Sequence, residues 1–134
     1  YNLIPNLTVD ENIMLPCLLD QRKPDAGKLE RIVEMTGLSN RRKHLPGQLS
    51  GGQQQRVSVG RALINDPAFI LADEPTGNLD SRSGREVIEL LMAANRKSGQ
   101  TLILITHDEN IALQANRILT ISDGRIIRDE VIRG

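Results

Sequence analysis

The sequence is poor in aromatic residues and has no excess of either charge. Tyr1 and Phe69 are its only aromatic residues, and 17 basic side chains balance 17 acidic ones. Without aromatic rings a chain has no platform on which nucleic-acid bases can stack. Without a basic field it does not attract a phosphate backbone. Both absences argue against nucleic acid as a partner.

Cysteine and long hydrophobic runs are also scarce. Cys17 is the only cysteine, which excludes a disulfide within the chain and suits a reducing compartment. The longest apolar runs, such as TLILIT at 101–106, are far too short to span a bilayer, and no signal peptide is visible. We therefore expect a soluble cytoplasmic chain, and its 134 residues have room for one compact domain.

The first third of the sequence predicts helices joined by polar loops. Thr8 is the expected N-cap of one helix, which Pro16 should kink or end. A second helix should start at Pro24 and close on Gly37. The connector that follows carries a basic cluster at 41–43, which we interpret as solvated surface.

The remainder alternates strands with helices. The continuous apolar runs at 68–73 and 101–106 are typical of strands buried on both faces. Between them, Ser81 should cap a helix that stops at Gly99. A short helix and then a hairpin that turns at 123–124 follow. This alternation predicts an α/β fold with mostly parallel core strands.

Ser50, Gly51 and Gly52 stand directly in front of a run that predicts a helix. A glycine costs about 1 kcal/mol inside a helix, so a pair at its start needs a reason. One reason is local: Ser50 caps the helix and the glycines loosen its first turn. The other is chemical, because bare amides at a helix N-terminus can bind a phosphate. On this stretch alone the local reason is favoured, since short glycine motifs recur by chance.

Carboxylates and a histidine follow the two predicted strands. Asp73 and Glu74 end the first strand, where one could hold Mg²⁺ through its waters and the other could face a reacting water. A turn cap by Asp73 explains that residue equally well. His107 ends the second strand on the same edge, where it could contact a phosphate oxygen or the attacking water, although lone histidines there are usually structural. Asp80, taken singly, is more simply a turn or helix cap.

Four motifs follow one another in the order LSGGQQQR, FILADEP, NLD and a strand ending in THD. In this order they leave little room for coincidence, and the chain resembles the ATP-binding cassette (ABC) family over essentially its whole length. ADEPTGNLD, SGGQQQRV and YNLIPNLTV are most similar to the class that serves macrolide or peptide export, lipoprotein release and cell division. The resemblance implies a partial P-loop NTPase (RecA-like) core, with mostly parallel strands, and an α-helical subdomain.

The resemblance also implies a role for the serine and glycines at the helix start. Ser50, Gly51, Gly52 and Gln53 would form the signature end of the family. In a head-to-tail dimer this end meets the γ-phosphate of ATP that the second nucleotide-binding domain holds. A hydroxyl, two unobstructed amides and the positive end of a helix all suit an anion.

The same resemblance implies that Asp73 supports Mg²⁺ and that Glu74 polarises the hydrolytic water. His107 would contact the γ-phosphate, and Asp80, in the D-loop, would act across the dimer interface. Phosphoryl transfer depends mainly on positioning and charge stabilisation, which these residues can supply. ATP and Mg²⁺ are therefore the expected substrate and cofactor.

The family's P-loop, Gly-x₄-Gly-Lys-Ser/Thr, is missing from this sequence. The only Gly-Lys pair is at 27–28, with Arg22 in place of the first glycine and Leu29 in place of the hydroxyl residue. The adenine-stacking aromatic and the Q-loop glutamine are missing too, because Tyr1 corresponds to the position just after that glutamine.

The chain is therefore expected to be a fragment. It would comprise the helical signature subdomain over 1–65 and the second half of the ATPase core over 66–134. Alone it should neither hold ATP tightly nor hydrolyse it at a useful rate. The family's P-loop strand lies between the strand that ends at His107 and the one that begins near Arg117. Without it, unpaired edges should cause self-association, swapped strands or a rearranged sheet.

The leading hypothesis is the ATPase subunit of a membrane transporter, peripheral on the inner face of the cell membrane. Its partner would be a transmembrane permease, whose coupling helix docks around residues 1–20 by family resemblance. One alternative is a non-catalytic dimerisation or interaction module, favoured by the missing P-loop and opposed by Glu74 and His107. Another is a non-transport ABC ATPase, against which the neutral charge and the scarcity of aromatics speak.

Overall fold

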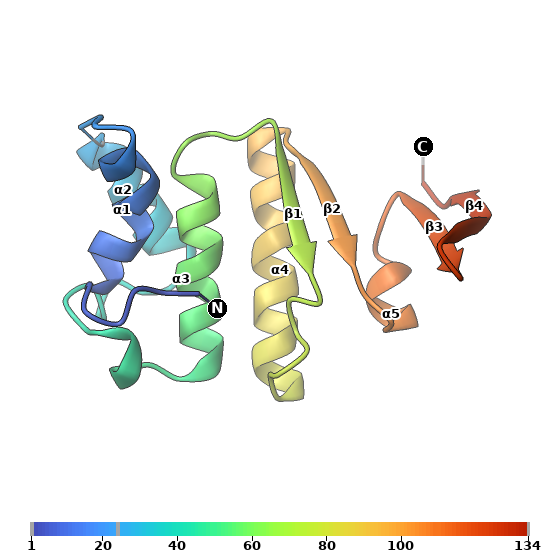
Figure 1. The fold of residues 1–134 in the computed structure, drawn as a ribbon, viewed down its shortest axis with the longest axis horizontal. Coiled ribbons are helices and arrows are strands. Elements are labelled where there is room, and N and C mark those ends of the chain that lie inside the picture. The colour runs from blue at the N-terminus through green and yellow to red at the C-terminus, as the bar shows by residue number, and fades with distance from the viewer. Residues whose placement is uncertain (1, 24, 134) are drawn as a thin grey trace.

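Helices form the first half of the fold (Figure 1). One small sheet lies beside the last long helix, and a second small sheet lies near the C-terminal end of the chain. The computed structural model describes residues 2–23 and 25–133. In chain order the elements are α1 (Val9–Leu19), α2 (Ala26–Met35), η1 (Pro46–Gln48), α3 (Gly51–Leu63), β1 (Phe69–Asp73), α4 (Ser81–Ser98), β2 (Thr101–Ile105), α5 (Glu109–Ala112), β3 (Arg117–Ser122) and β4 (Arg125–Val131).

Thr8 caps α1, as the sequence predicts. Its hydroxyl accepts a hydrogen bond from the Glu11 amide, and the Glu11 carboxylate accepts one from the Thr8 amide in return. The expectation that Pro16 could end this helix is wrong, because α1 continues to Leu19. A proline removes one helical hydrogen bond, but the next turn still closes through the Asp20 amide, which donates to the Pro16 carbonyl at 3.2 Å.

The second helix also agrees with its sequence signals. The carboxylate of Asp25 accepts a hydrogen bond from the Gly27 amide at 2.9 Å and so caps α2. Gly37 follows the end of α2 with a φ of 70°, a conformation that glycine adopts without strain. The expected start at Pro24 lies outside the described residues, as does Tyr1.

The helix α4 begins one residue earlier than the sequence predicts. Asp80, and not Ser81, is its N-cap, because the Asp80 carboxylate accepts the amide of Ser83 at 3.3 Å. The helix ends as expected at Gly99, which is left-handed with a φ of 65°. Aspartate and serine are comparable caps, so composition alone did not distinguish the two positions.

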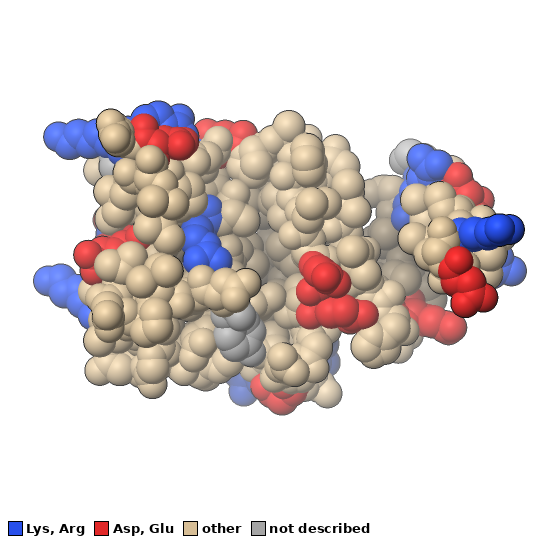
Figure 2. Space-filling model, viewed as in Figure 1, with Lys and Arg blue, Asp and Glu red and all other residues tan. Residues whose placement is uncertain are grey.

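The strands β1 and β2 pair in parallel, with Phe69 opposite Thr101 and Asp73 opposite Ile105. One face of this sheet packs on α4, where Ile70 is buried. The expectation that both faces are buried is wrong for the described residues. Four large apolar side chains of the other face are exposed, because no described element covers them: Phe69, Leu71, Ile103 and Ile105. In Figure 2 the surface over these strands is largely uncharged, and acidic side chains gather where the strands end.

The hairpin of β3 and β4 is a second, antiparallel sheet and does not pair with β2. Its turn is the predicted one, since Asp123 and Gly124 have φ values of 51° and 74°. The hairpin is largely exposed and stands beside α5 (Figure 1). The Arg133 side chain, just after β4, donates hydrogen bonds to the carbonyls of Leu113 and Ala115, in the segment that follows α5. The expected self-association through open strand edges stays a prediction.

A single buried cluster joins the helices to the sheet. It includes Ile13 from α1, Val57 from α3, and Val87 and Leu91 from α4, all almost completely buried. This cluster crosses the expected boundary between residues 65 and 66, and the division into 1–65 and 66–134 stays a prediction. No helix in the described part of the chain has the length and apolar character needed to cross a membrane.

Asn12 is the fully buried polar anchor of the segment that precedes α1. Its Oδ1 accepts the Ile4 amide at 2.8 Å, and its Nδ2 donates to the carbonyls of Ile4, Leu7 and Thr8. We expect Asn12→Ala to lower the free energy of unfolding by about 2–3 kcal/mol, because several polar groups lose their partner. Urea unfolding followed by circular dichroism measures the loss. The exposed Asn6→Ala should stay within about 0.5 kcal/mol of the parent, and equal losses from the two variants would contradict the anchor role.

Candidate functional site

The residues singled out in the sequence lie along one edge of the molecule. In Figure 1 the strands β1 and β2 run downward, toward the side of the molecule on which α3 and α4 begin. Parallel strands bring their carboxyl ends to one side of a sheet, and helices that precede or follow such strands run antiparallel to them. The topology therefore places the serine and glycines of the signature end on the same side of the fold as the carboxylates and the histidine.

Glu74 and His107 are in direct contact at this edge. The Nδ1 atom of His107 lies 2.8 Å from Oε1 of Glu74, and the histidine side chain is 88 % exposed. The hydrogen bond with Glu74, and then the charge of that carboxylate, raise the pKa of His107 above its ordinary value of 6.5. Two residues that the sequence placed on one edge thus form a pair that a substrate in solution can reach.

The backbone of Glu74 adopts a conformation that is rare for a residue with a side chain. Its φ is 46°, in the left-handed region. Such a residue costs about 1–3 kcal/mol and persists only where its surroundings hold it. Here the Glu74 amide donates to the Ile105 carbonyl at 2.8 Å, and the Glu74 carbonyl accepts from the Gly77 amide at 3.1 Å. The side chain of Gln55, on α3, donates to the Pro75 carbonyl at 3.0 Å.

At the start of α3, Ser50 caps the helix, as the local explanation of this residue predicts. The Ser50 hydroxyl accepts the Gln53 amide at 3.1 Å, and the Gln53 side-chain oxygen accepts the Ser50 amide at 2.9 Å. Both side chains therefore satisfy their own helix end in this structure. No hydrogen bond from the amides of Gly51 and Gly52 is found among the described residues, as is usual in the first turn of a helix, and Gly52 is buried.

Gly52 has a packing role that the sequence did not reveal. A Cβ atom built at this position would lie 3.0 Å from the Cβ of Ser83 and 3.1 Å from its Oγ. Only a glycine lets the first turn of α3 approach α4 this closely. The signal was present as a glycine followed by a helix, but its partner lies 31 positions further along the chain and is identified only by the fold.

Asp73 and Asp80 are placed differently from Glu74. Asp73 is exposed at the end of β1, and no three His, Cys, Asp or Glu side chains cluster as metal ligands within residues 2–23 and 25–133. One carboxylate fits Mg²⁺ only if a nucleotide supplies further oxygens, which is the usual arrangement for this ion. Asp80 caps α4, and its hydrogen bonds with Ser83 lower its pKa.

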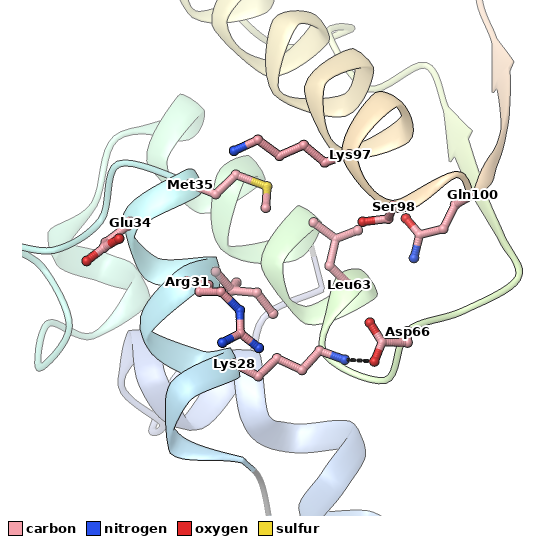
Figure 3. Close-up of a pocket in the computed structure, with 10 residues that line it drawn as sticks. Lys28, Arg31, Glu34, Met35, Leu63, Asp66, Lys97, Ser98 and Gln100 are labelled. Carbon is pink, nitrogen blue, oxygen red and sulfur yellow. Dashed lines mark ion pairs between the residues drawn. The ribbon is translucent and has the colours of Figure 1, made fainter.

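A hollow of about 510 Å³ lies at the other end of α3 and α4, away from Glu74. Figure 3 shows Lys28 and Asp66 joined across it at 2.5 Å, with Arg31, Lys97 and Gln100 on its other sides. The lysine of the only Gly-Lys pair is thus paired with an aspartate. The charges of both signs in this hollow give it no clear ligand chemistry.

The chain is similar to known proteins both in sequence and in fold. The ABC transporter family profile matches residues 1–77. The chain belongs to the ABC transporter family. It is 48% identical over 132 residues to the macrolide export ATP-binding/permease protein MacB of Rhodospirillum rubrum, covering 96% of this chain and 20% of that protein. It is 45% identical to MJ0796, an ABC transporter ATP-binding protein of Methanocaldococcus jannaschii, over 100% of this chain and 60% of that protein.

The fold of this ABC family chain is also similar to the folds of solved structures. A dimeric MJ0796 in a post-hydrolysis state, bound to ADP and Pi, superposes with a TM-score of 0.82 at 42% identity, covering 99% of this chain and 60% of that one. A second dimeric MJ0796 structure has a TM-score of 0.80 at 43% identity. The expected α/β fold with a partial P-loop NTPase core is therefore confirmed. The chain spans only about a fifth to three fifths of the length of these relatives.

Loss of the Glu74 charge should change the titration of His107. In the Glu74→Gln variant we expect the pKa of His107 to fall toward 6.5, because the two largest causes of its elevation come from the Glu74 carboxylate and only the smaller effect of the Asp108 charge remains. Proton NMR titration of the parent chain and the variant measures this change. Since the folded pKa is raised, the pair stabilises the fold below the unfolded pKa and loses this contribution as the pH rises through the folded pKa. An unchanged His107 midpoint would contradict the pairing.

The close approach of α3 and α4 can be tested by a double-mutant cycle. We expect Gly52→Ala to cost about 1–3 kcal/mol of the free energy of unfolding through overpacking. Adding Ser83→Gly should recover part of this, so that the double variant loses less than the sum of the single losses. Gly47→Ala is the matched control, because nothing lies within 4 Å of a Cβ built there. Additive losses in urea unfolding would show that the two positions do not press on each other.

Proposed function

We propose that this chain is the signature and catalytic-carboxylate part of an ABC ATPase that powers a membrane transporter. One observation carries the proposal: Glu74 and His107 form a 2.8 Å pair at the carboxyl edge of a parallel sheet. A module used only for binding has no need of an exposed carboxylate–imidazole pair. The family of the chain supports the same activity.

In this proposal Glu74 orients and polarises the water that attacks the γ-phosphate of ATP. Glu74 raises the pKa of His107, so this imidazole is in its positively charged form more often than a free one. In that form both ring nitrogens donate, and one can donate a hydrogen bond to a γ-phosphate oxygen. Asp73 would hold Mg²⁺ through a water molecule, and the ion neutralises charge on the phosphates when bound. These residues position and stabilise, which is what phosphoryl transfer requires.

The signature end would serve a second nucleotide-binding domain. Gly51 and Gly52 form the N-terminal turn of α3, and a phosphate is favoured at such a helix end. We propose that they contact the γ-phosphate held by the partner domain, with Ser50 and Gln53 at its side, in a head-to-tail dimer. Asp80 would lie at the dimer interface while it caps α4. The dimeric state of the solved MJ0796 cassettes supports this arrangement.

A permease would be the second partner. MacB is named as an ATP-binding and permease protein, and this chain is similar to about a fifth of it. We propose that a transmembrane permease docks on residues 1–20 and keeps the ATPase at the inner face of the cell membrane. The β- and γ-phosphates would need a P-loop that the 134 residues do not contain. The isolated chain should therefore not hydrolyse ATP.

A calorimetric titration with Mg-ATP tests this proposal on two proteins. One is the 134-residue chain, and the other is a chimera in which it replaces the corresponding 60% of MJ0796. We expect the chimera to bind and hydrolyse ATP and the chain alone to do neither. In the chimera, Glu74→Gln should leave ATP binding intact and lower kcat by at least about a hundredfold, because the water loses its base.

Two other outcomes would argue against the proposal. Tight binding of ATP by the chain alone would mean that another surface replaces the P-loop. A chimera that folds, dimerises and binds ATP without hydrolysing it would favour the non-catalytic interaction module.

A further inference from the structure

Three consecutive glutamines at the start of α3 point to three different partners. Gln53 bonds to the cap of its own helix, and Gln54 donates to the Pro46 carbonyl at 3.1 Å, in the connector just before the helix. Gln55 instead reaches across to another part of the fold, where its Nε2 donates to the Pro75 carbonyl at 3.0 Å. Of the three, it alone connects the signature helix to the segment that carries Glu74.

The carbonyl that Gln55 holds belongs to the residue next to the proposed catalytic carboxylate. Pro75 is buried, and Glu74 stands in the left-handed region with a φ of 46°. A strained residue keeps its direction only if both sides of it are held. The Glu74 amide is held by Ile105 from β2, and the next carbonyl is held by Gln55 from α3. The orientation of the Glu74 side chain therefore depends on two neighbouring elements.

Gln55 also lies close to the two glycine amides of the signature end. Gly51 precedes it by four positions, which is about one turn of an α-helix. In the proposed dimer these amides serve the nucleotide of the partner, whereas Glu74 serves the nucleotide of its own subunit. One side chain thus connects the parts of this chain that act on two different nucleotides.

We infer that Gln55 is a positioning residue for Glu74, and that it holds the signature end and this carboxylate as one unit. The inference rests on the proposed function. Its chemical requirement is a donor at position 55, because the partner is a carbonyl that can only accept. Glutamate has the same shape as glutamine but presents an acceptor there, whereas lysine is of similar reach and presents a donor.

Steady-state ATP hydrolysis by the MJ0796 chimera tests this requirement. We expect Gln55→Glu to lower kcat about ten- to a hundredfold, as small displacements of a catalytic group do. The KM for ATP should stay within about twofold of the parent, since the phosphate contacts remain. Gln55→Lys should recover most of the lost kcat. Gln54→Glu is the matched control, because its side chain bonds only to the connector, and it should retain at least about half of kcat.

A second measurement separates positioning from a general loss of stability. In Gln55→Glu the pKa of His107 should fall toward its ordinary value, because Glu74 moves away from the imidazole, and in Gln54→Glu it should stay raised. Proton NMR titration measures the pKa of His107 in both variants, at a temperature at which all variants remain folded.

The outcomes distinguish a failure of the proposed function from a failure of the inference about Gln55. If the parent chimera does not hydrolyse ATP, the proposed function fails. If the parent is active but Gln55→Glu and Gln54→Glu lower kcat equally, the inference is wrong and the function stands. The inference is also wrong if Gln55→Glu lowers kcat only in proportion to a loss of folded protein, with the His107 titration unchanged.

Discussion

The close packing of α3 against α4 is the constraint on which the functional edge depends. Gly52 lies so near Ser83 that a single added methyl group would meet it at 3.0 Å. This contact brings the N-termini of the two helices together, and with them the signature end and the D-loop. The hydrogen bond from Gln55 to Pro75 then ties the same helix to the end of β1. The position of Glu74 relative to the signature end follows from these two contacts.

The distribution of apolar residues explains why the two halves of the fold differ. The helices and one face of the β1–β2 sheet share a single buried cluster, which stabilises this part of the chain. The opposite face of the sheet exposes Phe69, Leu71, Ile103 and Ile105, and the hairpin at the chain end is largely exposed. The sequence predicts that both faces of these strands are buried, but within the described residues only one face is covered. Their composition suits a larger surrounding fold, in agreement with relatives of which this chain spans only a part.

Local signals predicted the ends of elements well, and longer-range packing less well. The caps at Thr8 and Ser50 and the left-handed glycines at Gly37 and Gly99 depend on residues within a few positions, so the sequence contains the whole interaction. A helix end at Pro16 and the capping of α4 by Ser81 were wrong, because the helical hydrogen bonds continue beyond the proline and Asp80 is an equivalent neighbouring cap. The glycine at position 52 was a local signal, but its packing partner Ser83 lies 31 positions away and is identified only by the fold.

The sequence by itself determined the family, the α/β alternation and the residue types at the candidate site, because motif order and strand-end chemistry are local properties. It also predicted that Glu74 and His107 share an edge, since parallel strands end on one side. Only the tertiary structure decided that Nδ1 of His107 meets the carboxylate at 2.8 Å and that Glu74 is left-handed. Only the tertiary structure, too, connected Gln55 to Pro75 and Gly52 to Ser83. These contacts join positions 20 to 33 residues apart, and such pairings exist only once helices and strands have packed against each other.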